Sequence, residues 1–270
     1  MSANEFDPLL RKMDDELAGW SEPAERLRYA LAKDELALYC QPIAALHGAV
    51  RFPMAEVLVR LHDEEKSLLP PGQFLPLFEH YRMMPDLDRW VVRHVVQHLA
   101  RGSRIPCFTV NASSQTLDDP AFPKAVALEL VSAGVSGTAL HFEISEGDTL
   151  ARLEAAVRFS TALRAVGCGI IVSGFGRRTA TFLPLKKLRP DYVKVDGVIV
   201  RKLLTGPAAE AKLKAIIRVG EVMGFQVIAE MVEEQDILTR LKALGVAYAQ
   251  GFGIREPHPI ELIASQAAAT

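Results

Sequence analysis

Oxygen-donor side chains recur near the ends of apolar segments in this sequence, and their residue types suit divalent cations. Glu56, Asn111 and Glu143 each adjoin a run of aliphatic residues. Carboxylate and amide oxygens are the ligands that hard cations such as Mg²⁺ and Mn²⁺ prefer. Lys194 and Glu230 lie at the ends of two further apolar segments. The five residues predict one shared site that could hold a divalent cation.

A purely structural interpretation of the same residues is a polar layer in which Lys194 pairs with the carboxylates. A buried carboxylate without a partner costs several kcal/mol, so a single glutamate and lysine would favour that interpretation. Five matching segment ends favour a functional site instead. Further polar residues at or near segment ends are Gln41, Arg60, Glu146, Asp196, Glu233 and Gln250.

The elements that position these residues read as an alternation of strands and helices. Runs of β-branched residues such as Ile170–Val172 indicate buried strands. The eight predicted strands are 35–43, 55–61, 107–113, 140–145, 169–175, 191–197, 226–232 and 247–252, and the clearest helices between them are 85–100, 151–166 and 207–223. This alternation predicts an α/β fold, a closed (β/α)₈ barrel, whose sites lie at the carboxyl ends of the strands.

Composition bounds the classes of function. The chain has 270 residues, of which 49% are hydrophobic, and its net charge of −2 argues against nucleic acid as a partner. No apolar run reaches the roughly 18 residues that a membrane span needs, and the charged N-terminus lacks a signal-peptide core. Cys40, Cys107 and Cys168 adjoin apolar segments, so we expect buried, reduced thiols and a cytoplasmic protein.

One main domain accounts for most of the chain. We expect an N-terminal helical extension over residues 1–24, with Ser21 as a candidate N-cap and Pro23 in the first turn of the helix that follows. Residues 25–270 then form the barrel domain, because no linker or low-complexity tract divides them.

An ordered series of short motifs resembles the EAL-domain family, the cyclic di-GMP phosphodiesterases. The motifs are "CQPI", "AEVLVR", "LDRW", "VNAS", "FEISE", "VKVD", "AEMVE" and "QGF". They follow one another at the family's spacing between residues 25 and 262. Each motif alone is weak, but the series is specific. The signature strand reads Glu-Val-Leu here, where the name-giving motif is Glu-Ala-Leu.

The resemblance implies a (β/α)₈ barrel whose first strand is antiparallel to the others. In active members, two metal ions activate a water that attacks one phosphodiester of cyclic di-GMP and yields linear pGpG. Carried over by position, the metal ligands would be Glu56, Asn111 and Glu143. Lys194 would contact the attacking water or stabilise developing charge, and Glu230 would assist.

The family pattern breaks at "VSGFG". Where the family has two adjacent aspartates, of which the first bridges the metals, this chain has Ser173 and Gly174. The loop that follows is altered too, and it carries Arg177 and Arg178; one of these arginines could swing into the metal position. We therefore expect a degenerate, catalytically inactive member that requires no cofactor, with Mg²⁺ or Mn²⁺ bound only if part of the metal site survives.

The features that resemble the family's nucleotide groove are better preserved. Arg60 can form a forked contact with a phosphate, and Asp88 resembles the residue that accepts hydrogen bonds from a guanine edge. The full set of candidate ligand-binding residues is Gln41, Glu56, Leu58, Arg60, Asp88, Asn111, Glu143, Asp196, Glu233, Gln250 and Pro257.

Three functions stay open at this point. The first is a cyclic di-GMP receptor that signals through an unidentified protein effector. The second is a protein-interaction regulator that no longer binds the nucleotide, and the third is a residual phosphodiesterase. A homodimer is compatible with the resemblance, although the family's dimerisation loop is altered. Retention of Arg60 and Asp88 favours the receptor, and Ser173 and Gly174 argue against the phosphodiesterase.

Overall fold

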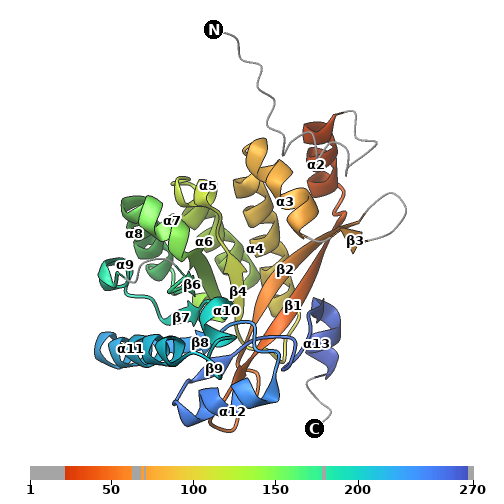
Figure 1. Ribbon diagram of the computed structural model, residues 1–270. Coiled ribbons are helices and arrows are strands. Elements are labelled where there is room, and N and C mark those ends of the chain that lie inside the picture. The colour runs from red at the N-terminus through yellow and green to blue at the C-terminus, as the bar shows by residue number, and fades with distance from the viewer. Residues whose placement is uncertain (1–21, 63–67, 70, 178–180, 267–270) are drawn as a thin grey trace.

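The computed structural model describes residues 22–62, 68–69, 71–177 and 181–266, which form a closed barrel surrounded by helices (Figure 1). The barrel strands are β1 (Leu36–Ala45), β2 (Met54–His62), β4 (Phe108–Asn111), β5 (Leu140–Ser145), β6 (Gly169–Phe175), β7 (Tyr192–Val195), β8 (Gln226–Ala229) and β9 (Tyr248–Ala249). The short strands β3 (Leu68–Leu69) and β10 (His258–Pro259) pair with β2 and β1, respectively. All eight predicted strands are confirmed, and so is the predicted barrel.

Strand β1 closes the barrel and differs from the others in direction. It pairs antiparallel with β2 on one side and with β9 on the other, whereas the pairs from β2 through β4 to β9 are parallel. The connection between β1 and β2, residues 46–53, is too short for the crossover that parallel neighbours need. The antiparallel first strand is therefore confirmed, and β1 and β2 form a long hairpin.

Helices cover the outside of the barrel. They are α2 (Pro23–Ala32), α3 (Pro71–His80), α4 (Met84–Ala100), α5 (Ser114–Leu117), α6 (Phe122–Ala133), α7 (Glu146–Ala151), α8 (Leu153–Arg164), α9 (Leu183–Leu188), α10 (Gly197–Val200), α11 (Pro207–Met223), α12 (Gln235–Ala243) and α13 (Ile260–Gln266), with a 3₁₀ turn at Gly137–Ala139. The predicted helices 85–100, 151–166 and 207–223 correspond to α4, α8 and α11.

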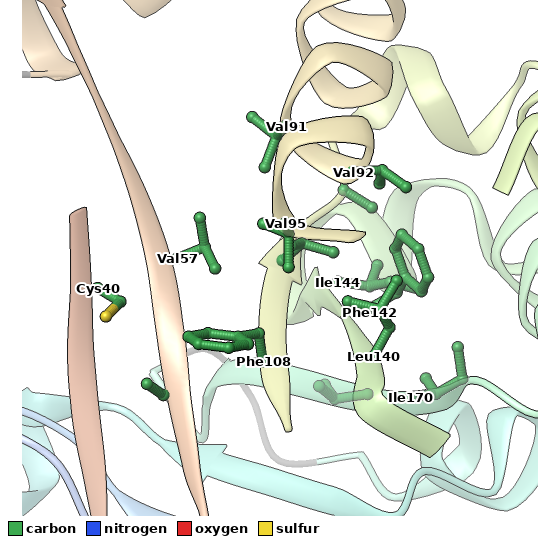
Figure 2. Close-up of a cluster of buried hydrophobic side chains, with 14 of the residues drawn as sticks. Cys40, Val57, Val91, Val92, Val95, Phe108, Leu140, Phe142, Ile144 and Ile170 are labelled. Atoms are coloured by element: carbon green, nitrogen blue, oxygen red, sulfur yellow. The ribbon is translucent and has the colours of Figure 1, made fainter. Parts of the chain in front are cut away.

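The main hydrophobic core lies between the barrel wall and this helical layer. Figure 2 shows Val57 of β2 and Phe108 of β4 on the side of the barrel that α4 covers with Val95. A smaller hydrophobic cluster, which includes Ile43 and Ile228, lies inside the barrel. Since successive strand residues point to opposite faces, the same strands supply the outer core and the polar residues of the interior.

The N-terminal prediction needs one correction. Helix α2 begins at Pro23, as expected, but its N-cap position is Glu22, which makes no side-chain capping hydrogen bond. Ser21 and most of the predicted extension over residues 1–24 lie outside the described residues. The three cysteines are buried and free, as predicted. Among the described helices, none is long and apolar enough to cross a lipid bilayer.

Candidate functional site

Five polar residues, each from a different strand of the barrel or its carboxyl end, meet inside the carboxyl-terminal mouth. Glu56 comes from β2, Asn111 from β4, Glu143 from β5 and Lys194 from β7, and Glu230 directly follows β8. Asn111 and Glu143 are register partners on adjacent parallel strands, which puts them at the same height. The structure thus brings together the five residues whose types first indicated a shared site.

Lys194 is the centre of this cluster. Its side chain is fully buried, and Nζ lies 2.6 Å from Oε2 of Glu56 and 2.5 Å from Oε2 of Glu143. Glu56 also accepts hydrogen bonds from Nδ2 of Asn111 at 3.0 Å and from Nε2 of Gln250 at 2.8 Å. Buried charges are tolerated when they are paired and hydrogen-bonded in this way. The lysine ammonium therefore occupies the space between the two carboxylates.

The cluster holds more acidic groups than one ammonium can neutralise, and the pKa values reflect this. Burial, with the neighbouring Glu56 charge, raises the pKa of Glu143 to about 7. Burial also raises the pKa of Glu230 to about 8. At Glu56 burial opposes ionisation, but Lys194 outweighs it and the pKa is lowered. Burial likewise opposes the Lys194 charge, yet Glu143 and Glu56 raise its pKa. Protons are thus shared within the cluster near neutral pH.

A cavity of about 290 Å³ opens above the cluster. Its lining residues are Gln41, Glu56, Glu230, Met231, Glu233, Gln250, Gly251 and Phe252. Gln250 Nε2 donates to Oε1 of Gln41 at 3.0 Å, and Gln41 Nε2 donates to the carbonyl of Arg255 at 3.0 Å. The predicted roles of Gln41 and Gln250 at the mouth are consistent with this arrangement, because both amides are held in fixed orientations.

Sequence reasoning missed two apolar residues at the rim of the cavity. Phe252 and Met231 are 63% and 49% exposed. Met231 has a φ of 54°, a left-handed conformation that is uncommon for a residue other than glycine. Its side chain lies against Gly197, where an added Cβ would approach Met231 Sδ to 2.6 Å. Exposed apolar side chains beside buried polar groups are typical of a ligand pocket.

The carboxyl end of β6 contributes no carboxylate to the mouth. The hydroxyl of Ser173 hydrogen-bonds to Glu143. Gly174 lies where the pairing register between β6 and β7 shifts, between Val172 and Phe175, and has a φ of 63°. Arg177 is exposed, and Arg178 lies outside the described residues. Over the described ranges, the cation that pairs with Glu56 and Glu143 is Lys194 and not Arg177, and the prediction for Arg178 stays a prediction.

The donor set does not fit a two-metal centre. Glu56, Asn111 and Glu143 retain oxygen atoms, but both carboxylates face the Lys194 ammonium and Asn111 presents its amide nitrogen to Glu56. Within the described part of the chain, no group of three His, Cys, Asp or Glu side chains could hold a metal ion. Ser173 offers only a neutral hydroxyl at this position.

Arg60 and Leu58 lie on the same face of β2 as Glu56, farther up the hairpin. Both are half-buried. Nη1 of Arg60 donates to the carbonyl of Val59 at 2.9 Å, and its guanidinium lies 5.3 Å from the centre of the Tyr39 ring. Arg60 lies four residues after Glu56 on the same strand. The rise of an extended strand therefore places it about 13 Å beyond Glu56, at the rim of the mouth.

Two predicted ligand-binding aspartates already have partners in the fold. Asp88 of α4 is buried, and its Oδ2 accepts from the Ser113 amide at 3.0 Å and from Thr116 Oγ1 at 2.5 Å. Burial raises the pKa of Asp88 to about 6. Asp196 caps α10 by accepting from the Val198 amide at 2.8 Å. Their contacts with a ligand stay predictions.

The other two candidates lie nearer the surface. Glu233 is exposed at the cavity lining, and Pro257 is half-buried just before β10. Their predicted roles in ligand binding stay predictions.

The fold and the site define a class of protein: a (β/α)₈ barrel with an antiparallel first strand and a lysine–glutamate cluster at the carboxyl ends of its strands. The family is given by comparison with known sequences, because the EAL domain family model matches residues 24–257. The chain therefore belongs to the EAL-domain family.

Relatives with known names share a moderate level of sequence identity. The chain is 31% identical over 240 residues to the cyclic di-GMP phosphodiesterase PdeB of Shewanella oneidensis, covering 88% of this chain and 28% of that protein. It is 32% identical over 246 residues to an uncharacterized protein of Mycobacterium tuberculosis, covering 87% and 79%. It spans 28%, 33% and 31% of the first three curated relatives it matches.

Solved structures agree with the fold. The FimX EAL domain of Pseudomonas aeruginosa bound to c-di-GMP superposes with a TM-score of 0.82 at 28% identity, covering 88% of this chain and 96% of that one. The PaMucR phosphodiesterase in complex with c-di-GMP gives a TM-score of 0.80 at 27% identity, covering 90% and 99%.

Proposed function

We propose that this EAL domain binds cyclic di-GMP without hydrolysing it and passes the signal to a protein effector. The observation that carries the proposal is the carboxyl end of β6, where Ser173 and Gly174 stand in place of the two aspartates of the family pattern. Lys194 is already paired with two of the remaining carboxylates in the mouth, 2.6 Å from Glu56 and 2.5 Å from Glu143. The domain keeps a mouth suited to a polar ligand but lacks the bridging ligand for a two-metal displacement.

Retention of nucleotide binding is supported by groups that need no metal. Within the described ranges, the Arg60 guanidinium at the rim donates to the Val59 carbonyl and keeps further N–H groups for a phosphate, and Gln41 and Gln250 are held in place at the cavity. Met231 and Phe252 add exposed apolar surface beside these polar groups. Solved relatives at 27–28% identity contain c-di-GMP, which supports the same ligand here.

A residual phosphodiesterase is the second candidate, favoured by one observation. Glu56, Asn111 and Glu143 still meet at one mouth, and the relative PdeB is named a cyclic di-GMP phosphodiesterase. A regulator that binds no nucleotide would require neither Arg60 nor the cavity. Titration calorimetry with cyclic di-GMP separates this regulator from the other two candidates, because only the receptor and the enzyme give a binding isotherm. Release of pGpG then separates the enzyme from the receptor.

Binding of cyclic di-GMP is expected to be largely independent of Mg²⁺. Arg60 and contacts to the guanine bases need no cation, and the site lacks the carboxylate that would bridge two metals. The measurement is the Kd in excess EDTA against the Kd in millimolar Mg²⁺ or Mn²⁺. If EDTA weakens binding more than tenfold, about 1.4 kcal/mol, a metal site survives and the receptor proposal loses its main support.

The substitution Arg60→Ala is expected to weaken nucleotide binding by about 1.5–3 kcal/mol, the range for a hydrogen bond to a charged group. This corresponds to a roughly 10- to 150-fold higher Kd. The matched control is Arg51→Ala, which removes the same charge from the hairpin loop, where Arg51 stacks on Phe52 at 5.1 Å. Calorimetry that finds equal Kd values for both variants contradicts a phosphate contact by Arg60.

A further inference from the structure

Tyr39 is the aromatic neighbour of Arg60 at the rim of the mouth. In the β1–β2 ladder Tyr39 is the register partner of Leu58, and Ala37 is the partner of Arg60. Tyr39 and Arg60 are therefore diagonal neighbours on one face of the hairpin, within reach of an aromatic ring and a long side chain. It is the face that carries Gln41 and Glu56 into the barrel mouth, because side chains on one face recur every second residue.

The geometry explains why the arginine adopts this conformation. Ala37, directly opposite Arg60, is too small to contact the guanidinium, which instead lies 5.3 Å from the centre of the Tyr39 ring. Nη1 of Arg60 donates to the Val59 carbonyl at 2.9 Å, which gives the guanidinium a second contact besides the Tyr39 ring. Over the residues that the structure describes, no carboxylate forms an ion pair with Arg60. Among the described residues, its contacts are therefore the Val59 carbonyl and the Tyr39 ring, which leave further N–H groups for a ligand.

We infer that Tyr39 is a positioning residue for ligand binding, which holds the Arg60 guanidinium ready for a phosphodiester. This inference rests on the proposed function, since it names the determinant of the same site. An arginine that is ordered before binding loses less side-chain entropy when the phosphate arrives. The aromatic face provides this order, and the Tyr39 hydroxyl is not needed for it.

The experiment compares variants that keep and remove the ring. Calorimetry with cyclic di-GMP is expected to give a Kd within twofold of wild type for Tyr39→Phe. Tyr39→Leu and Tyr39→Ile, two ring-free variants in case one folds poorly, are expected to raise the Kd about two- to fivefold, the range for an exposed cation–π contact. In an Arg60→Ala background, Tyr39→Leu should have no further effect, because the group that it positions is gone.

Nuclear magnetic resonance of the free protein adds a test that does not depend on the nucleotide. The Arg60 Hε resonance, assigned by its loss in Arg60→Ala, should show a ring-current shift in wild type and Tyr39→Phe that disappears in Tyr39→Leu. Absence of nucleotide binding by the wild type overturns the proposed function and this inference together. Wild-type binding that the ring-free variants leave unchanged, or that they weaken equally without Arg60, overturns this inference alone.

Discussion

Incubated with cyclic di-GMP and Mg²⁺ or Mn²⁺, the protein is expected to release no pGpG at an ordinary enzymatic rate, on the order of 1 s⁻¹. Two metal ions would have to stabilise both the attacking and the leaving oxygen of an in-line displacement. Ser173 is a neutral ligand, Gly174 has no side chain, and the Lys194 ammonium lies between the carboxylates that remain. We therefore expect almost no phosphodiesterase activity compared with an active enzyme. Chromatographic detection of pGpG over hours measures it.

The substitution Ser173→Asp provides the positive control for this explanation. It restores a carboxylate at the end of β6, next to Glu143, and is expected to increase Mn²⁺ affinity measured by calorimetry. Ser173→Asn, with the same shape and no charge, should not. The substitution Gly174→Asp is expected to be less well tolerated. Gly174 has a φ of 63°, a backbone conformation in which residues other than glycine are strained. Rapid pGpG production by the wild-type protein would show that the bridging aspartate is dispensable.

The substitution Lys194→Met is expected to lower the free energy of unfolding by about 3–5 kcal/mol at pH 8. Removing one partner of a buried ion pair leaves an uncompensated charge, and that cost exceeds the net contribution of the intact pair. Here Glu56 and Glu143 would lose a fully buried ammonium at once. Guanidinium unfolding curves measure the effect. The matched control is Lys214→Met, which removes a surface pair with Glu210 and should lower the free energy of unfolding far less.

The effect of Lys194→Met should shrink as the pH is lowered from 8 to 5. In the wild type the pKa values of Glu143 and Glu230, about 7 and about 8, lie above the unfolded value of 4.5. The folded state thus binds more protons between pH 4.5 and 8, and these two residues make stability fall as the pH rises through that window. Without Lys194 the glutamates can still become neutral by protonation at pH 5. Equal losses of stability at both pH values would contradict a charge-based role for Lys194.

The arrangement of the barrel was predictable because it depends on local patterns. Runs such as Ile170–Val172 predict strands wherever they occur, and eight of them alternating with helices leave few folds other than a closed barrel. Parallel strands then end at one mouth, so Glu56, Glu143 and Lys194 could be brought together from sequence alone. The antiparallel first strand came from the family resemblance.

The chemistry of the mouth was decided by tertiary structure. Lys194 and Glu56 are 138 residues apart, and only barrel closure and strand register put Nζ 2.6 Å from Oε2. The capping role of Asp196 and the left-handed conformation of Met231 depend in the same way on backbone geometry that no residue spacing encodes. The contact between Tyr39 and Arg60 depends on the β1–β2 register. This register places the small Ala37 opposite Arg60 and Tyr39 diagonally across from it. Sequence patterns predict which face a side chain occupies, but its partners depend on distances that exist only after the chain has closed on itself.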